Sequence, residues 1–328
     1  MKHLTLLIPD VQTGPNTVSC IIGAYHAFSE ANSYFNKLGK PSVFKIELVG
    51  TSNSSEFVNG LLTIRPQFTI QSVHKTDLII IPALDGEFKM AKQQNKLLAD
   101  WIRGQYKVGA EIASMCTGAY LLAATELLNG RSCSIHWDSV EHFRKLFPKV
   151  HLKVEKLITD EHGIYTNGGG FSFLNLLIYL IEKYYNRETA IYCSKVLQIE
   201  IDRQSQSDFV IFSGQKSHGD DIVHKAQAYM ESNFCEKISV EKLSKELAIG
   251  RRNFDRRFIR ATGNTPVEYL QRLKIESAKK SLETTRKTVS EIMYEVGYSD
   301  HKAFREVFRK ITGISPLEYK NKYNKETS

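Results

Sequence analysis

A sixteen-residue pattern occurs twice in the last third of the chain, and it constrains the fold more than any other feature of the sequence. The first copy covers residues 254–269 and the second, fifty residues later, covers residues 304–319. Eight of the sixteen positions agree when Ser is counted as equivalent to Thr. An internal repeat indicates that one supersecondary unit has been used twice. This part of the chain is therefore expected to contain two similar motifs.

The shared positions of the repeat predict a helix that ends at a glycine. Phe254 and Phe258 are four residues apart, and the second copy repeats the pair. Two rings at this spacing lie on one face of a helix and can be buried together. Gly263 and Gly313 supply the left-handed residue that ends such a helix.

A second helix is expected to begin three residues after the first one ends. Each copy has a capping hydroxyl, a proline at the first helical position and a glutamate at the third, and this combination starts helices. These residues are Thr265, Pro266 and Glu268 in the first copy, and Ser315, Pro316 and Glu318 in the second.

A short amphipathic helix is predicted ahead of each phenylalanine pair. The apolar side chains of the first are Val240, Leu243 and Leu247, and those of the second are Val289, Ile292 and Val296. Tight turns follow at residues 248–250 and 297–299, and Thr288 with Glu291 forms a capping box on the second of these helices. Helix, tight turn and helix is the helix-turn-helix plan, whose second helix enters the major groove of DNA.

The segment between the two copies is predicted to be one long helix. Apolar residues recur at roughly helical spacing from Pro266 to Thr284. About twenty residues at 1.5 Å each give a helix of roughly 30 Å. Since one turn of B-DNA is about 34 Å, such a helix can hold two recognition helices in successive major grooves.

Basic and amide side chains crowd the first of the two predicted recognition helices. Arginine can bridge two acceptors of guanine, asparagine can pair with adenine, and both can hold phosphate. The second recognition helix is less charged where it would face the groove, so the first is expected to carry more of the affinity. The predicted DNA contacts are Arg251, Arg252, Asn253, Asp255 and Arg256 in the first helix and His301, Lys302 and Arg305 in the second.

The charge distribution agrees with a polyanionic partner. Residues 221–328 hold 22 Lys+Arg against 15 Asp+Glu, which accounts for +7 of the net charge of +8. A basic third beside a neutral remainder is typical of a nucleic-acid-binding region. A solvated basic face without a partner, or a helical bundle that binds protein, is the alternative interpretation.

Residues 222–323 resemble the DNA-binding module of the AraC/XylS family. The resemblance lies in residues 297–299, the Phe304 and Phe308 pair, and the tail from Gly313 through Ser315 and Pro316 to Tyr319. It implies that Arg252, Asp255 and Arg256 contact bases from the first helix, and His301, Lys302 and Arg305 from the second. The chain departs from the family at Glu306, whose carboxylate would repel phosphate where the family often has arginine.

The first two-thirds of the chain predicts a different fold. Apolar runs at residues 4–8, 43–49, 78–81 and 108–115 are each followed by a longer periodic segment, an alternation typical of a parallel sheet with helices on both faces. With 328 residues, two domains are expected. We predict an α/β domain at 1–202, a polar linker at 203–221 and an all-α domain at 222–328.

Cys116 follows an apolar strand and opens a small-residue helix start, the arrangement of a nucleophile elbow. A thiol beside a helix N-terminus is expected to have a lowered pKa. His136, twenty residues later, could act as its base. A purely structural role for both residues is the alternative interpretation.

Residues 4–201 resemble the DJ-1/PfpI branch of the class I glutamine amidotransferase-like fold, fused to an AraC module as in the GlxA-type regulators. The matching residues are 116–119, 129–131, 136–137 and 166–169, ahead of a helix at 171–185. The resemblance implies a pocket built by the cysteine elbow and the histidine. Enzymes of the family also have a carboxylate after the first strand, but around residues 17–27 this chain has Val18, Ser19, Cys20 and Ile21.

We therefore expect a sequence-specific transcriptional regulator whose first domain senses a small molecule, for instance an amino-acid-like one, or an oxidant, without catalysis. The pocket candidates are Asp85, Gly86, Cys116, Thr117 and His136. A Cys-dependent amidase or hydratase carrying a DNA-binding module is the main alternative, and a dimerisation scaffold with a buried Cys116 is another.

The expected partners are operator or promoter DNA, a small-molecule effector, RNA polymerase and a second copy of the chain. No cofactor and no metal is expected, since the five cysteines lack zinc spacing. No apolar run is long enough to span a membrane, and a cytoplasmic location is expected.

Overall fold

The structure is a computed structural model that describes residues 1–10, 13–86, 88, 95–216 and 218–324. The chain forms two compact units, Met1–Gln206 and Ser207–Ser328. The boundary between them lies inside the segment that the sequence suggests as a linker, 203–221. The part of this segment from Ser207 onward belongs to the second unit rather than lying free between the two.

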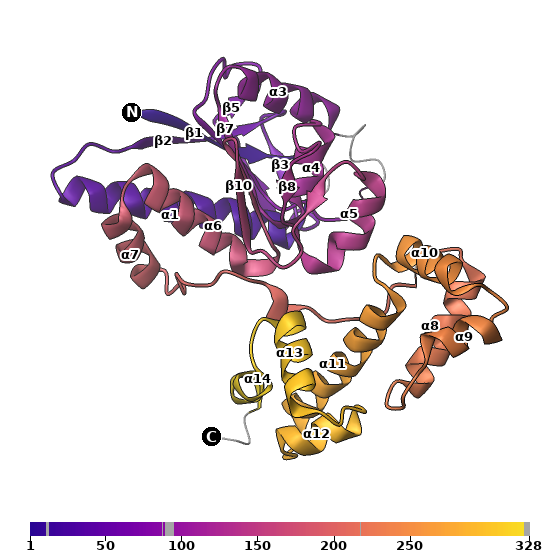
Figure 1. The fold of residues 1–328 in the computed structure, drawn as a ribbon. Helices are drawn as coiled ribbons and strands as arrows, with labels where there is room; N and C mark the ends of the chain where they lie inside the picture. Colours follow the sequence, from indigo (N-terminus) through magenta and orange to yellow (C-terminus); the bar gives the residue numbers. More distant parts are fainter. Residues whose placement is uncertain (11–12, 87, 89–94, 217, 325–328) are drawn as a thin grey trace. The chain divides into compact units, whose positions relative to one another are not determined.

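The first unit is built on a seven-stranded sheet (Figure 1). All neighbouring strands are parallel except the pair β10 and β11 at one edge, so the predicted α/β class is confirmed. In spatial order the strands are β10 (Ile158–Glu161), β11 (Ile164–Asn167), β7 (Glu111–Ser114), β6 (Leu78–Ile81), β1 (Lys2–Ile8), β2 (Phe44–Gly50) and β5 (Phe68–Thr69).

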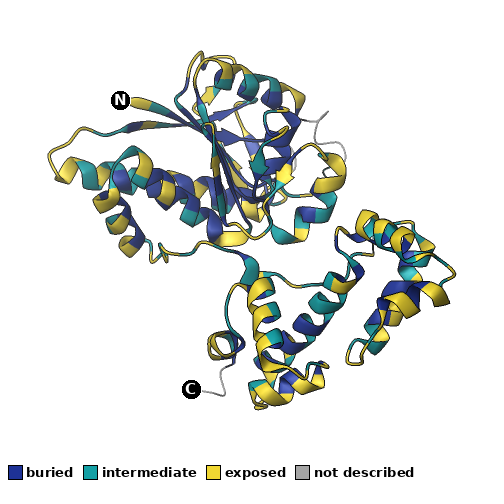
Figure 2. Cartoon of the chain, in the orientation of Figure 1, coloured by how far each residue is buried: buried dark blue, intermediate teal, exposed yellow. Residues whose placement is uncertain are grey.

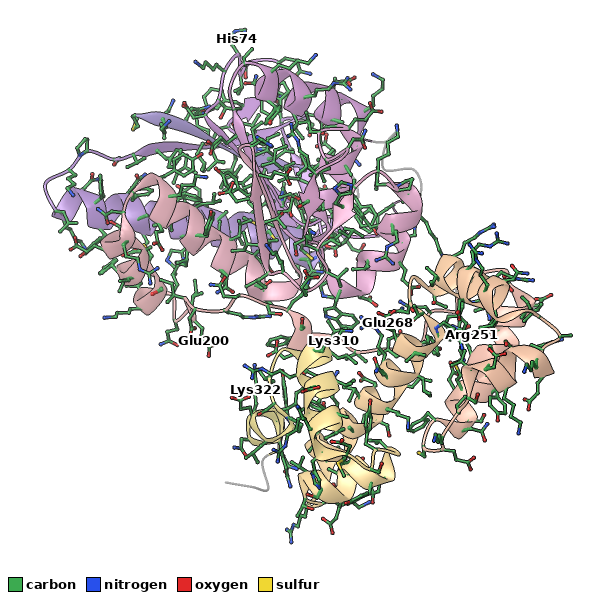
Figure 3. The ribbon with its side chains drawn as sticks, in the orientation of Figure 1. His74, Glu200, Arg251, Glu268, Lys310 and Lys322 are labelled. Atoms are coloured by element: carbon green, nitrogen blue, oxygen red, sulfur yellow. The ribbon has the colours of Figure 1, made fainter. Side chains whose placement is uncertain are left out.

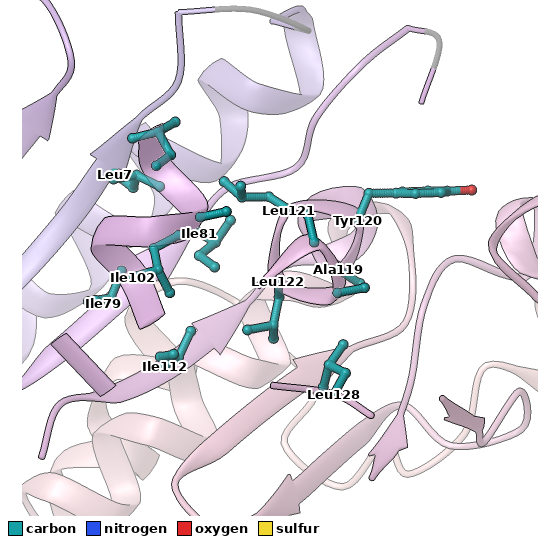
Figure 4. Close-up of a cluster of buried hydrophobic side chains, with 14 of the residues drawn as sticks. Leu7, Ile79, Ile81, Ile102, Ile112, Ala119, Tyr120, Leu121, Leu122 and Leu128 are labelled. Carbon is teal, nitrogen blue, oxygen red and sulfur yellow. The ribbon is translucent and has the colours of Figure 1, made fainter. Parts of the chain in front are cut away.

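Helices cover both faces of the sheet because its central strands are apolar on both sides. Alternate strand residues point to opposite faces. Leu7, Ile79 and Ile81 pack in one cluster with the helices α3 (Lys96–Lys107), α4 (Ala119–Ala124) and α5 (Val140–Leu146), as Figure 4 shows in part. Leu6 and Ile80 pack in the other cluster, with α1 (Pro15–Lys37), α6 (Phe173–Tyr184) and α7 (Arg187–Val196).

One expectation about the first unit is wrong: the second apolar run is not followed by a helix. After β2 the chain forms the antiparallel hairpin β3 (Ser55–Phe57) and β4 (Leu62–Ile64), and then β5. The turn between β3 and β4 has three consecutive residues with positive φ, which are Val58, Asn59 and Gly60. Such a run of left-handed residues is incompatible with a helix. A small pair, β8 (Ser132–Cys133) and β9 (His151–Leu152), lies beside the sheet.

The described part of the second unit is helical apart from its turns and its first segment. Two helix-turn-helix motifs follow one another, α9–α10 and α12–α13, with α11 between them. The helices are α8 (Asp221–Asn233), α9 (Val240–Glu246), α10 (Arg251–Thr262), α11 (Pro266–Thr284), α12 (Val289–Glu295), α13 (His301–Thr312) and α14 (Pro316–Tyr323).

The helix ends in this unit are those that the repeat predicts. Gly263 and Gly313 end α10 and α13 with φ of 72° and 85°. Capping boxes open α11 and α14, and in each the backbone N–H of the glutamate donates to the hydroxyl three residues earlier. A further capping box at Thr288 opens α12. The predicted repeat and its boundaries are confirmed.

The two motifs have separate hydrophobic cores, and α11 contributes to both. Phe254, Phe258 and Tyr269 belong to the first core and Phe304, Phe308 and Tyr319 to the second. All six rings are 2% exposed or less. In Figure 2 the buried residues of α10 and α13 line one side of each helix and exposed residues the other. Each recognition helix is therefore fixed by its own core.

No helix in the described ranges is long and apolar enough to cross a bilayer.

Candidate nucleic-acid interface and ligand pocket

The outward face of α10 is strongly cationic. Phe254 and Phe258 are buried, so residues about half a turn away from them point to solvent. Arg252, Arg256 and Arg260 occupy this face at four-residue spacing, and all three are exposed. Three guanidinium groups in one row on a helix can reach both base edges and phosphates of DNA.

Internal ion pairs and hydrogen bonds divide the residues predicted on α10. The Arg251 Nε donates to both carboxylate oxygens of Asp255, at 3.0 and 2.9 Å, so this pair lies on the flank of the helix (Figure 3 labels Arg251). One terminal nitrogen of Arg256 donates to the Asn253 Oδ1 at 3.0 Å. Arg252 and Arg256 therefore stand at the centre of the exposed face, with Asn253 held beside Arg256.

The second recognition helix repeats this geometry with different charges. The predicted residues His301, Lys302 and Arg305 are all exposed on α13. By the fifty-residue repeat, Lys302 corresponds to Arg252, and Glu306 corresponds to Arg256. A carboxylate thus occupies the centre of the face where α10 has a guanidinium. The two helices present unlike surfaces on like scaffolds.

The helix between the two motifs has the predicted length. With 19 residues, α11 is about 28 Å long at 1.5 Å per residue. This is close to the roughly 34 Å between successive major grooves on one side of B-DNA.

In the first unit, Cys116 lies on a sharp turn after β7. Its φ is 52°, a left-handed value that is unusual for a side-chain-bearing residue. It begins a short 3₁₀ turn (Cys116–Gly118) that runs into α4. Gly118 is required there, because a Cβ at this position would lie 2.5 Å from the Pro82 carbonyl oxygen. The predicted elbow is present.

The predicted lowering of the Cys116 pKa is wrong. Burial raises the pKa of the thiol above its ordinary value, although hydrogen bonds from the backbone of Gly170 and Thr117 oppose this. The side chain is 8% exposed, so the cost of burying a thiolate exceeds what the short helix start supplies. At neutral pH the thiol is protonated.

A small cavity of about 90 Å³ opens at this thiol. Cys116 and His136 line it together, as predicted. Asp85, Gly86 and Thr117 are not among its lining residues. The others are Asn16, Ser19, Cys20, Ala83, Gly170, Phe171 and Phe173.

Asp85 and Thr117 instead organise the loops around the cavity. The Asp85 carboxylate accepts hydrogen bonds from the Asn16 amide at 2.9 Å and the Thr17 hydroxyl at 3.3 Å. Thr117 donates to the Leu84 carbonyl and accepts from its N–H. Gly86 is exposed with a φ of 98°, next to residues outside the described ranges.

His136 closes one side of the cavity. Its ring lies against Gly169, where an added Cβ would be 1.6 Å from the imidazole carbon Cδ2. The Nδ1 atom accepts a hydrogen bond from the Asp138 N–H at 3.2 Å, and burial lowers the pKa of the imidazole. Within the described residues no hydrogen bond joins His136 to Cys116. A neutral imidazole and a protonated thiol form a binding wall rather than an ion pair.

Cys20 is one of the seven lining residues that the sequence did not suggest as pocket candidates. It lies on α1, in the region where a family carboxylate was sought, and burial raises the pKa of its thiol to about 12. The helical spacing of Asn16, Ser19 and Cys20 after the first strand was the available signal, because parallel strands bring their following segments to the same edge of a sheet.

No group of three His, Cys, Asp or Glu side chains in the described part of the chain is placed to hold a metal ion.

Two family models match the chain. Residues 22–169 match the DJ-1/PfpI family, and residues 243–322 match a helix-turn-helix domain. The DJ-1/PfpI match covers the sheet apart from β1 and includes Cys116 and His136, and the helix-turn-helix match covers both recognition helices.

Several curated proteins are similar over most of the chain. The HTH-type transcriptional regulator GbdR of Pseudomonas aeruginosa is 22% identical over 284 residues, which are 86% of this chain and 76% of that protein. The HTH-type transcriptional regulator GlxA of Rhizobium meliloti is 22% identical over 220 residues, 66% of each chain. A candidate transcriptional regulator from Vibrio parahaemolyticus, solved as a crystal structure, has a TM-score of 0.52 and 22% identity over 60% of this chain and 98% of its own.

Proposed function

We infer that this chain, a DJ-1/PfpI domain followed by a C-terminal helix-turn-helix domain of the AraC type, is a sequence-specific DNA-binding transcriptional regulator. The observation that carries this conclusion is the pair of recognition helices, each exposing cationic side chains and separated by a single helix of about 28 Å. This spacing suits successive major grooves. We assign base reading to Arg252 and Arg256 on α10 and to Lys302 and Arg305 on α13.

Arg251 and Asp255 have a different role in this proposal. Because their side chains are bound to one another, we assign them to positioning of the arginine face rather than to independent base contacts. Breaking the pair would therefore disturb the position of the arginine face more than it would change the charge of the helix.

The first unit acts as a sensor without catalysis. Support comes from the Cys116 cavity, where a protonated thiol and a neutral imidazole are not hydrogen-bonded to one another in the described structure. The cavity is small, at about 90 Å³, so the part of an effector that enters it is small. An amino-acid-like effector would place one end there.

The alternative function is a Cys-dependent enzyme, and the observation in its favour is the positive φ of Cys116 on the elbow. Steady hydrolysis of an amide or hydration of a substrate, abolished by Cys116→Ala while DNA binding persists, would establish it. An oxidant sensor is the remaining option, and a peroxide response lost in Cys116→Ser would distinguish it from an effector pocket.

A homodimer and a contact with RNA polymerase are part of the proposal by analogy with regulators of this domain plan. The mass of the full chain in sedimentation equilibrium, with and without DNA, tests the first. Transcription in a purified system tests the second.

The direct test of the function is binding of the purified full chain to promoter fragments at several salt concentrations. A preferred site protected in footprinting over two successive grooves, with affinity that falls steeply with salt, is expected. Binding that does not discriminate any fragment from random duplex would refute the proposal. Arg252→Ala serves as the loss-of-contact variant, and Lys242→Ala, on an exposed ion pair of α9, is its matched control.

A further inference from the structure

The segment Ser207–Lys216, called the strap below, is bound along the second unit. It begins with a short 3₁₀ turn, Ser207–Phe209, that packs against α13. It then follows α11 toward α8, against the chain direction of α11. The strap therefore reaches from the second helix-turn-helix motif to the first.

The first end of the strap is fixed to α14. The Lys322 Nζ lies 2.6 Å from the Asp208 carboxylate, and the same ammonium is 4.8 Å from the centre of the Phe209 ring (Lys322 is labelled in Figure 3). The Tyr323 hydroxyl donates to the Asp208 carbonyl at 3.4 Å. The Asp208 side chain is only 13% exposed, so this anchor is partly shielded from solvent.

The middle of the strap is held by a buried ion pair of α11. Lys279, whose side chain is 4% exposed, donates to the Val210 carbonyl at 2.5 Å and to Glu276 at 2.9 Å. Glu276 in turn accepts the Phe212 N–H at 3.1 Å. A buried ammonium and carboxylate need such partners. The strap supplies hydrogen-bond partners to the ion pair, and the ion pair in turn binds the strap backbone.

The far end of the strap joins the first motif. The Phe212 ring packs edge-on against Tyr269, with centroids 5.3 Å apart. Gln215 accepts from the Gln227 side chain at 3.0 Å through its carbonyl and from the Asn264 amide at 2.6 Å through its side chain. Gln227 is fully buried on α8. The strap therefore also packs against the hydrophobic core of the first motif.

These contacts matter because the two motifs have separate cores. In the described part of the second unit, the motifs are joined through α11, through the strap, and through the close approach of Gly297 to Cys235 beside Lys274. The strap touches both motifs and the helix between them. It is placed to fix the separation and rotation of the two recognition helices.

The residue immediately before the strap, Gln206, does not line the Cys116 cavity but is hydrogen-bonded to segments that adjoin two of its lining residues, His136 and Gly170. Gln206 is 2% exposed, and its side-chain amide donates to the carbonyls of Ile135 at 3.0 Å and Val154 at 2.8 Å. Its side-chain oxygen accepts the Gly169 N–H at 3.4 Å. Ile135 precedes His136, and the His136 ring packs against Gly169. Gln206 therefore contacts both segments that position His136.

We propose that Gln206 and the strap couple the Cys116 cavity to the register of the two recognition helices. A change at His136 shifts the hydrogen-bond partners of Gln206, and the next residue of the chain begins the strap. When the strap is bound to Lys279 and Glu276, it holds the two motifs at one spacing. When the strap is released, α11 and the contact at Gly297 remain to fix this spacing. The proposal rests on the function inferred above, and Gln206 is a positioning residue in it. An effector can act through this route only if it binds the two strap states unequally.

The first test is hydrogen exchange of the strap amides in the full chain, without DNA or effector. His136→Ala is expected to speed exchange of the Phe212 amide at least tenfold, whereas amides of β7 and α13 keep their rates. Gln206→Ala is expected to speed it similarly, and the double variant no further than either alone. Unchanged strap exchange in His136→Ala would overturn the coupling. Cys116→Ala provides the same comparison if His136→Ala does not fold.

The second test is a spacing series on the mapped operator. Insertion of five base pairs between the half-sites turns them to opposite sides of the duplex, and the wild-type chain is expected to lose at least thirtyfold in affinity. In the variant Asp208→Ala with Phe212→Ala, this loss is expected to shrink below fivefold. Lys287→Ala, which breaks an exposed ion pair away from the strap, should keep the wild-type penalty.

The outcomes separate the two ideas. A strap variant that loses affinity equally at every spacing would mean that the strap only stabilises the fold, and would overturn the inference. A wild-type chain without a preferred site at any spacing would instead overturn the proposed function. Normal operator binding with no link from His136 to the strap would leave the function intact and refute the coupling.

Discussion

Arg257 holds Asp220 in a two-pronged ion pair that joins the recognition helix α10 to the start of α8. The guanidinium donates to both carboxylate oxygens, at 2.8 and 2.7 Å. The same carboxylate caps α8 by accepting the Val223 N–H at 3.1 Å. The pKa of Asp220 lies below its ordinary value, chiefly because its carboxylate accepts the hydrogen bond from Arg257. One carboxylate thus fixes both a helix start and the orientation of α10.

Replacing Asp220 should destabilise the second unit. Asp220→Ala is expected to cost about 1 kcal/mol through the lost cap, and Asp220→Asn less, since asparagine still caps the helix. The measurement is denaturant unfolding of the full chain, followed by a signal from the helical unit. Because the folded pKa is depressed, this carboxylate's stabilisation is complete above its unfolded pKa of about 3.9 and is lost as pH falls through the lower folded value. An equal loss for both variants at pH 7 would place the effect in the ion pair instead.

Arg256 and Glu306 should have opposite effects on DNA affinity. Arg256→Ala is expected to weaken binding by roughly 1–3 kcal/mol and to relax the preference at one base pair. Glu306→Gln is expected to strengthen binding, because a carboxylate near phosphates is removed. Titrations of operator variants at several salt concentrations measure both. Equal weakening of Arg256→Ala on every sequence would make it a phosphate contact.

Gly297 should be less replaceable than other glycines with positive φ. Gly297→Ala combines a left-handed φ of 76° with a Cβ only 1.9 Å from the Cys235 carbonyl oxygen. The conformation alone costs roughly 1–2 kcal/mol, and the overlap must add to it by moving the backbone. Gly130→Ala is the control, with a φ of 73° and nothing within 4 Å. Calorimetry of the full chain should show a larger loss of stability for Gly297→Ala than for Gly130→Ala. Equal losses of stability would mean that the backbone at Cys235 moves away from the new Cβ at no cost.

Cys235 should be alkylated long before Cys116. Cys235 is exposed whereas Cys116 is buried, and burial raises the Cys116 pKa above its ordinary 9.0. Less than about 1% of that thiol is then ionised at pH 7. Iodoacetamide labelling read by peptide mass spectrometry should give fast modification of Cys235 and slow modification of Cys116 that accelerates with pH. Comparable rates at pH 7 would restore the reactive-thiol interpretation.

The helical half of the fold followed from the sequence because its signals are local. Capping residues, proline at the first helical position and the glycines that end α10 and α13 fix helix boundaries within a few residues of themselves. The apolar runs also located β1, β2, β6 and β7. The β3–β4 hairpin was missed, because its strands are three residues long and Leu61 and Leu62 are exposed rather than alternating with polar residues.

The candidate site was less accessible, because it depends on contacts between distant segments. The sequence located Cys116 and His136, but the Cys116 pKa depends on burial by α1 and the loop at Gly170, which no local pattern reveals. Gln206 read as one more polar residue of a linker. Its role emerges only from hydrogen bonds to Ile135 and Val154, more than fifty residues earlier.

The unlike faces of α10 and α13 also determine how the protein sits on a duplex. Two identical recognition helices related by a two-fold axis would recognise a palindrome and would bind equally well in either direction. Here Arg256 and Glu306 stand at matching positions, so we expect the two half-sites bound by one chain to differ and the bound site to have a direction. Each operator copy is therefore expected to have an orientation, and inverting it relative to the promoter should invert the orientation of the bound regulator.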